Sequence, residues 1–129
     1  MAMTRWKILL VFFLGFVPFA GAAPVTLDGN TLLPQCEAAV KMANGVTARN
    51  TDASYCLGFV NGIMVMAYDW QASAKQSKLT FLPCLPLDGM TSGQALRIVT
   101  KYLKAHPEKL HRDAHILVVE ALTEAFPCK

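Results

Sequence analysis

Apolar residues recur at helical spacing in four stretches of the chain, and no stretch shows the strict alternation of a half-buried strand. These stretches are residues 31–44, residues 54–73, the segment from Thr91 to the His106-Pro107 pair, and the segment from there to Pro127. The last is the most regular, with apolar residues at i, i+4, i+7, i+8, i+11, i+12 and i+15 from Leu110. The pattern predicts an all-α protein, a small bundle of about four helices.

Polar residues suited to helix N-termini stand before these stretches. Thr31 precedes the first, Asp52 or Ser54 the second, and Thr91 the third. Their side-chain oxygens can accept hydrogen bonds from free backbone N–H groups of a first helical turn. Thr91 is followed three residues later by Gln94, which is the pattern of a reciprocal capping box.

The second stretch is apolar on nearly all sides, and it contains Gly58 and Gly62 four residues apart. A helix of this kind is buried in a bundle or in lipid. Its apolar part from Tyr55 to Tyr68 would be about 21 Å long, which is short for a bilayer. We therefore expect a buried central helix in which Gly58 and Gly62 allow close helix packing, either within the chain or in a dimer.

The N-terminus has the pattern of a secretory signal peptide. Arg5 and Lys7 precede an uncharged apolar run, Ile8–Ala20, and small residues follow at cleavage-site spacing. The run is too short to span a membrane comfortably. We expect cleavage between Ala22 and Ala23.

This assignment divides the chain into a signal peptide, residues 1–22, and one helical domain, residues 23–129. The sequence is 53% hydrophobic and 16% charged, and the signal peptide accounts for part of that apolar excess. Its removal lowers the formal net charge from +3 to about +1. A nearly neutral domain gives no reason to expect nucleic-acid or anionic-lipid binding, so we expect no nucleic acid and, after cleavage, no membrane association.

Four cysteines, Cys36, Cys56, Cys84 and Cys128, lie in the mature part. An even number in an exported chain favours disulfides, and four cysteines allow three pairings. No C-x-x-C or other zinc-type spacing occurs. A short connection would make the last two helices an antiparallel hairpin, bringing Cys128 near the segment that carries Cys84. By elimination, Cys36 would pair with Cys56.

Catalytic and metal-binding patterns are sparse. His111 and His115 would share a helix face, with Glu108 or Asp113 near enough to complete a zinc site. Without an H-E-x-x-H motif, half-exposed helix residues are the favoured interpretation. No G-x-S-x-G, P-loop or dinucleotide motif occurs. We expect no enzyme activity, no catalytic or metal-binding residues and no cofactor.

Three segments together resemble the Rap/Tai-type immunity proteins of type VI secretion. They are "YCLGFVNGI", "FLPCLPLDGMTSGQALRIVTKYLKAHPEKLH" and "LVVEALTEAFPC". The matching residues are Cys56, Gly58, Phe59, Gly62, Cys84, Pro86, Tyr102, Leu103, His106, Pro107, Glu108, Ala121, Leu122, Ala125, Phe126, Pro127 and Cys128. The resemblance covers nearly all of the mature chain.

This resemblance implies a periplasmic, disulfide-bonded, all-helical protein without activity of its own, often a homodimer. Its partner would be a papain-like peptidoglycan amidase, an effector whose active cleft the immunity protein occludes. Because most of the matching residues specify a fold, an alternative is a general periplasmic chaperone or envelope-stress protein with no cognate toxin.

The long irregular segment from Gln71 to Asp88 is the candidate for partner contact, since long loops often carry function. Lys75, Lys78, Phe81 and Asp88 are the residues expected to contact the partner. For the lysines, ordinary solubilising charge is an equally good interpretation.

Overall fold

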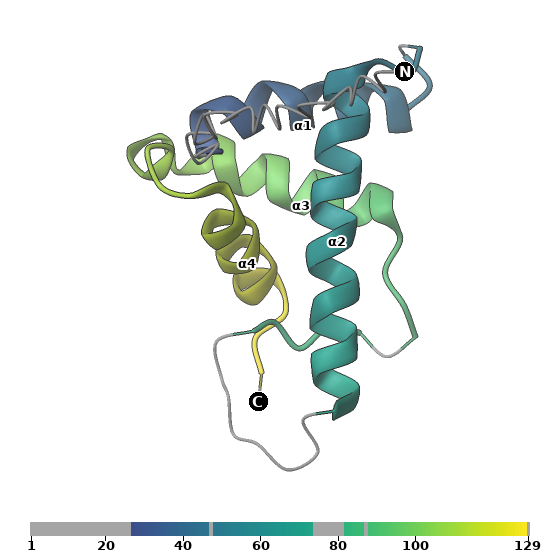
Figure 1. The fold of residues 1–129 in the computed structure, drawn as a ribbon, viewed down its shortest axis with the longest axis vertical. Coiled ribbons are helices and arrows are strands. Elements are labelled where there is room, and N and C mark those ends of the chain that lie inside the picture. Colours follow the sequence, from purple (N-terminus) through teal and green to yellow (C-terminus); the bar gives the residue numbers. More distant parts are fainter. Residues whose placement is uncertain (1–26, 47, 74–81, 87, 129) are drawn as a thin grey trace, which may run out of the picture.

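Helices make up most of the part of the chain that the structure describes (Figure 1). The computed structural model describes residues 27–46, 48–73, 82–86 and 88–128, so the predicted cleavage site at Ala22-Ala23 lies outside them. The elements are α1 (Gly29–Ala43), α2 (Thr51–Ser73), α3 (Ser92–Ala105), the 3₁₀ turn η1 (Pro107–Lys109) and α4 (Ala114–Ala125). Among the described residues, the only β pairing is an isolated antiparallel β-bridge between Asp28 and Asp113. The prediction of an all-α, four-helix fold is confirmed.

The hydrophobic core lies on one side of α2, where α1, α3 and α4 pack against it (Figure 1). Every helix contributes side chains without measurable exposure. They are Leu32, Cys36 and Ala39 of α1, Ala53, Cys56 and Ala67 of α2, Ala95 and Val99 of α3, and Ala114, Leu117, Val118 and Leu122 of α4. Each fully buried large aliphatic side chain contributes about 1.5–3 kcal/mol relative to exposure, so this core is the main source of stability.

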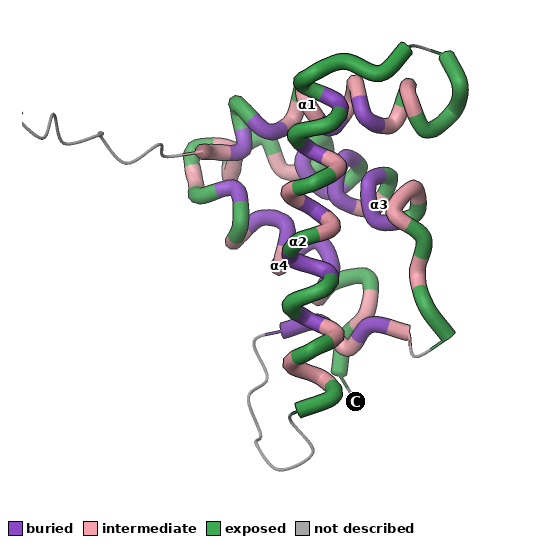
Figure 2. Tube along the Cα trace, turned by 45° about the vertical axis from the view of Figure 1, so that its right-hand side comes forward, coloured by how far each residue is buried: buried purple, intermediate pink, exposed green. Residues whose placement is uncertain are grey.

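The opposite side of α2 is exposed, contrary to the expectation of a helix buried all round (Figure 2). We call it the outer face of α2; it comprises Tyr55, Gly58, Gly62, Val65, Met66 and Asp69. Of the two alternatives for Gly58 and Gly62, close packing within the described chain is not observed, because a Cβ built at either position meets nothing within 4 Å. The exposed residues recur along one side of α2, so the helices packed against it cover only the other side. In the described part of the chain, no helix combines the length and apolar character needed to cross a membrane.

Helix caps follow the predicted chemistry but not always the predicted residue. Thr91 and Gln94 form the expected capping box at α3. At α1 the cap is Asp28, whose carboxylate accepts a 2.8 Å hydrogen bond from the backbone N–H of Thr31. At α2 it is Asn50, whose side-chain oxygen accepts a 2.7 Å hydrogen bond from the backbone at the third position of the helix. Both helices therefore begin two or three residues earlier than predicted.

The start of α4 lies later than predicted because the preceding residues bind the chain before α1. Gly29 N donates to Arg112 O at 3.1 Å, and Ala114 N donates to Leu27 O at 2.8 Å. Between these two hydrogen bonds Asp113 is extended, with φ −56° and ψ 130°. Residues 107–113 consequently form η1 and a turn, and the hairpin connection is longer than the very short one expected.

Candidate partner-binding site

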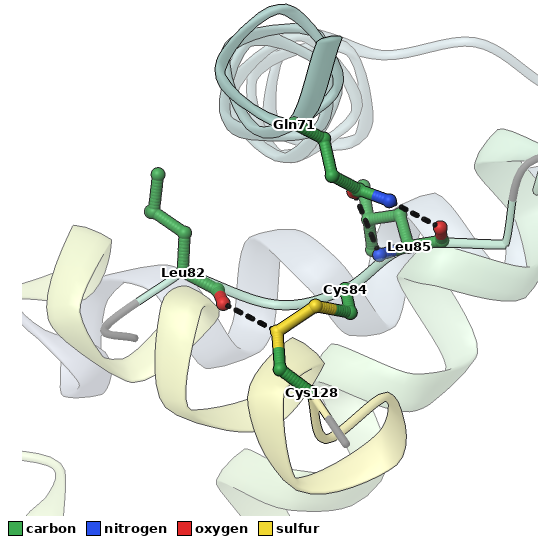
Figure 3. The surroundings of a disulfide bond; sticks show 5 residues. All are labelled: Gln71, Leu82, Cys84, Leu85 and Cys128. Atoms are coloured by element: carbon green, nitrogen blue, oxygen red, sulfur yellow. Dashed lines mark hydrogen bonds between the residues drawn. A yellow bond between two sulfur atoms is a disulfide. The ribbon is translucent and has the colours of Figure 1, made fainter. Parts of the chain in front are cut away.

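The two ends of the predicted contact segment are held together by the side chain of Gln71, near the C-terminus of α2 (Figure 3). Its Nε2 donates to Leu85 O at 2.9 Å, and its Oε1 accepts from Leu85 N at 2.9 Å. The amide therefore pairs with one residue of extended chain as a neighbouring strand would. We call residues 82–86 the strap, since they lie across the end of α2.

A second pair of hydrogen bonds holds the end of the strap. The Tyr68 hydroxyl donates to Pro86 O at 3.2 Å and accepts from Met90 N at 3.1 Å. Beneath these bonds the apolar strap residues Leu82, Pro83 and Leu85 are buried. Hydrogen bonds and apolar packing together fix the strap against the core.

The strap is also bonded covalently to the C-terminal segment, by the disulfide between Cys84 and Cys128 (Figure 3). Cys84 N donates to Phe126 O at 3.0 Å beside it. Cys128 Sγ lies 3.5 Å from Leu82 O, but a disulfide sulfur carries no hydrogen, so we treat this contact as packing. The other disulfide joins Cys36 of α1 to Cys56 of α2. These are the two pairs inferred from the sequence.

The predicted contact residues lie at this end of the molecule in sequence, but most are outside the described part. Lys75, Lys78 and Phe81 fall in the undescribed residues 74–81. Asp88 is exposed just after the strap. It precedes Gly89, which has a φ of +88° and donates from its backbone N to Pro86 O at 3.1 Å. The structure thus gives the frame that carries the segment, and the role of these four residues stays a prediction.

A polar network centred on Glu120 ties α3, η1 and α4 together. Its carboxylate accepts a 2.8 Å hydrogen bond from the Tyr102 hydroxyl and a 2.6 Å bond from Arg112. Lys109 Nζ donates to the Tyr102 hydroxyl at 2.7 Å and lies 3.6 Å from Glu120. The His106 ring packs on the Tyr102 ring at 4.1 Å between centroids. All these polar groups bind one another, so we interpret the network as structural.

The environment of this network shifts the pKa values of its members. Burial raises the pKa of Glu120, but hydrogen bonds from Tyr102 and Arg112 and the nearby positive charges outweigh it, so the pKa lies below its ordinary value. Burial, with help from Glu120, raises the pKa of the Tyr102 phenol. The hydrogen bond to Tyr102 raises the pKa of Lys109. Each group therefore keeps its ordinary charge state near neutral pH.

The histidines do not assemble a metal site in the described residues. His111 and His115 are both exposed. Within residues 27–46, 48–73, 82–86 and 88–128, no group of three His, Cys, Asp or Glu side chains could hold a metal ion.

Comparison with known proteins gives a match to a protein family. A family model described as Rap1a immunity proteins matches residues 28–128, from the cap of α1 to the second disulfide. No curated protein matches the chain. No solved structure matches it.

Proposed function

Because this chain belongs to the Rap1a immunity protein family, we propose that it is a periplasmic protein that inhibits a peptidoglycan amidase effector delivered by type VI secretion. Family membership implies protection against a secreted effector. The proposal adds the papain-like amidase as target and occlusion of its active cleft as mechanism. It also assigns the protein no catalysis of its own.

Export to the periplasm is part of this proposal. Two disulfides stabilise the fold, and structural disulfides form and persist in oxidising compartments. The predicted signal peptide, residues 1–22, would provide the route. Homodimer formation, which the resemblance implies, is also part of the proposal.

The observation that carries the inhibitory mechanism is the clamping of both ends of the segment between Gln71 and Leu85. Its first end belongs to α2, and its second end is held by two hydrogen bonds and a disulfide. Fixing the ends of a binding segment reduces the conformational entropy lost on binding, which favours affinity. This frame supports a cleft-blocking segment and requires no other machinery.

Within the segment, we assign Phe81 the role of apolar anchor and Lys75 and Lys78 the role of charged contacts. Aromatic side chains dominate binding energy at the centre of interfaces, whereas exposed charges act mainly on association rate. Asp88, exposed beyond the strap, would contact the rim of the cleft.

The test uses the oxidised mature chain and purified papain-like peptidoglycan amidases of the kind delivered by type VI secretion. We expect the wild-type chain to form a tight complex and stop peptidoglycan hydrolysis. Phe81→Ala should weaken binding at least 10-fold, and Lys75→Ala with Lys78→Ala should mainly slow association. Lys101→Ala, a change of an exposed lysine on α3, is the matched control and should change neither.

The outcomes separate the two parts of the proposal. A tight complex that Phe81→Ala leaves intact would overturn the contact segment and retain the function. If the wild-type chain neither binds nor inhibits the amidase, and a deletion strain survives attack by a type VI-armed sibling, the proposed function is wrong.

A further inference from the structure

A groove of about 460 Å³ opens between α1 and α3, which pack side by side (Figure 1). Three exposed residues of α3 that line it are positively charged. We propose that this groove binds the phosphate group of a small molecule. The site is separate from the contact segment of the proposed function. The residues that line it are Val40, Arg97, Thr100, Lys101, Lys104 and Ala105.

Two contacts between the helices close the groove at its ends. At one end Arg97 Nη2 donates to Asn44 Oδ1 at 2.7 Å. At the other end Lys104 Nζ lies 2.8 Å from Glu37 Oε1. The two contacts are seven residues apart on each helix, which is about 10 Å along the axis. Four residues of extended peptide would need about 13 Å, so the closed ends favour a small molecule over a peptide lying along the groove.

The base of the groove holds a polar group without a partner. Thr100 lines the groove and is 6% exposed, and its hydroxyl makes no hydrogen bond to any described residue. A buried hydroxyl without a partner is unfavourable. Threonine populates two χ1 rotamers in helices, so this hydroxyl can turn toward the groove without movement of the backbone. A ligand oxygen there would supply the missing partner.

The charge of the groove matches a phosphate monoester. Glu37 compensates Lys104, whereas Arg97 binds a neutral amide. Neither Arg97 nor Lys101 forms an ion pair with an acidic side chain in the described part of the chain. The groove therefore has two uncompensated positive charges, and a phosphate monoester carries about −1.5 to −2 at neutral pH. A single carboxylate would neutralise only one of them.

In the proposed complex the Thr100 hydroxyl donates to one phosphate oxygen and the Arg97 guanidinium to another. Arginine has five N–H donors, and the hydrogen bond to Asn44 leaves others available. Lys101 adds positive charge at the rim. Exposed charges are well solvated and contribute little each. We therefore expect a millimolar dissociation constant for inorganic phosphate, and a lower one for a monoester whose substituent packs on Val40.

Nuclear magnetic resonance titration of inorganic phosphate into the isotope-labelled, oxidised mature chain tests this site. The backbone amide signals near Thr100 and Val40 should shift and saturate, and chloride at matched ionic strength should not reproduce the shifts. Arg97→Gln should weaken binding about 10-fold, because it removes the charged donor. Glutamine retains an amide that can bind Asn44, and far-UV circular dichroism verifies that each variant is folded.

Thr100→Val separates ligand binding from stability. A methyl group in place of an unpartnered buried hydroxyl should leave the free energy of unfolding unchanged or higher, while phosphate binding weakens severalfold. Thr123→Val is the matched control, since the Thr123 hydroxyl is also buried without a partner among the described residues but belongs to α4. This control should leave phosphate binding unchanged. A Thr100→Val variant that loses stability and still binds phosphate would overturn the role of the hydroxyl.

Other results would overturn the site or its ligand. Shifts that chloride reproduces, or that do not saturate, report screening alone and overturn the inference. Binding that both Arg97→Gln and Thr100→Val leave intact places phosphate elsewhere and overturns it as well. Acetate that binds as tightly as phosphate overturns the choice of phosphate over a carboxylate. Binding to vesicles that contain phosphatidylglycerol, without binding of free phosphate, overturns the small molecule in favour of a lipid headgroup.

Discussion

The two disulfides close loops of different length and lie in different surroundings. Cys36 and Cys56 join α1 to α2 inside the core, and neither has any exposed surface. Cys84 is half-buried and Cys128 is exposed, and their bond joins the strap to the C-terminal segment. The inner bridge is thus part of the packed core, whereas the outer bridge joins two segments outside the helices at a partly exposed position. A disulfide therefore stabilises this protein in two different settings, one inside the core and one near the surface.

Loop entropy alone would rank the outer bridge higher. The inner pair is 20 residues apart and the outer pair 44. By the chain-entropy relation these separations correspond to about 3 and about 4 kcal/mol. Burial changes this order when the cysteines are replaced with serine, because each serine hydroxyl left unpaired in the core costs a further 1–3 kcal/mol or so. We therefore expect the buried bridge to contribute more once its surroundings are counted.

The largest effect is expected from replacing the inner pair with serine. The double variant Cys36→Ser with Cys56→Ser should have a free energy of unfolding lower by about 5 kcal/mol or more. This loss is enough to prevent cooperative folding in a domain of ordinary stability. Cys84→Ser with Cys128→Ser should lose about 4 kcal/mol or less and keep the helical content. Urea unfolding followed by circular dichroism measures both. A greater loss of unfolding free energy from the outer pair would show that loop entropy, and not burial, determines which disulfide stabilises the protein more.

Alanine variants at the same positions are the matched control. Alanine leaves no unpaired hydroxyl, so at the inner pair it should be less destabilising than serine. At the outer pair, where Cys128 is exposed, serine and alanine should be nearly equal.

A moderate effect is expected at the outer end from Gln71→Met. Methionine retains a long side chain but loses both hydrogen bonds to Leu85, which should cost about 1–3 kcal/mol because the backbone groups there are partly buried. Amide hydrogen exchange at Leu85 should accelerate while exchange in α1 stays slow. Ala72→Met, an exposed neighbouring position, is the control and should change neither rate.

Combining Gln71→Met with loss of the outer bridge sharpens the comparison. Both hold the strap, so their effects should not be additive. Additivity within about 0.3–0.5 kcal/mol would mean that the two restraints act independently, contrary to this description.

The smallest effect is expected from Glu120→Gln, in the charged network that joins α3, η1 and α4. The pKa of Glu120 is lower in the folded chain than its ordinary value. Its contribution is therefore present above the ordinary pKa and is lost as pH falls through the folded pKa. The wild-type advantage over Glu120→Gln should be below about 1 kcal/mol at pH 7, because the ion pairs are partly exposed. This stability difference should shrink on acidification toward pH 3, as measured by the urea midpoints of the two proteins. A difference that grows on acidification would contradict the lowered pKa of Glu120.

Local features of the fold could be predicted from the sequence, and features that depend on distant contacts could not. The capping box of Thr91 and Gln94 needs only four consecutive residues. The late start of α4 could not be predicted, because Asp113 is held extended by pairing with Asp28 far earlier in the chain. The exposure of Gly58 and Gly62 could not be read either, since composition shows that a helix is apolar but not how many neighbours surround it.

The same distinction holds at the site. The pairing of Cys84 with Cys128 followed from a rough idea of the last two helices. Gln71 was missed because nothing in the sequence around it indicates that its side-chain amide will pair with the backbone of a residue 14 positions away. The Tyr102–Glu120 contact, between two helices, was missed for the same reason. A glutamine that ends an apolar helix before a proline-flanked segment is a weak pattern that could have suggested the clamp.

The backbone hydrogen bonds of Gly29 with Arg112 and of Leu27 with Ala114 affect the order in which parts of the chain can fold. A chain that emerges from a ribosome or a translocation channel with its N-terminus first cannot place α1 until the residues before α4 have followed. The partner of Cys84 arrives later still, at position 128. Cys36 and Cys56 are the first two cysteines to emerge, so they can meet while the rest of the chain is still in transit. The cell's oxidising machinery would therefore encounter the inner pair first and the outer pair last.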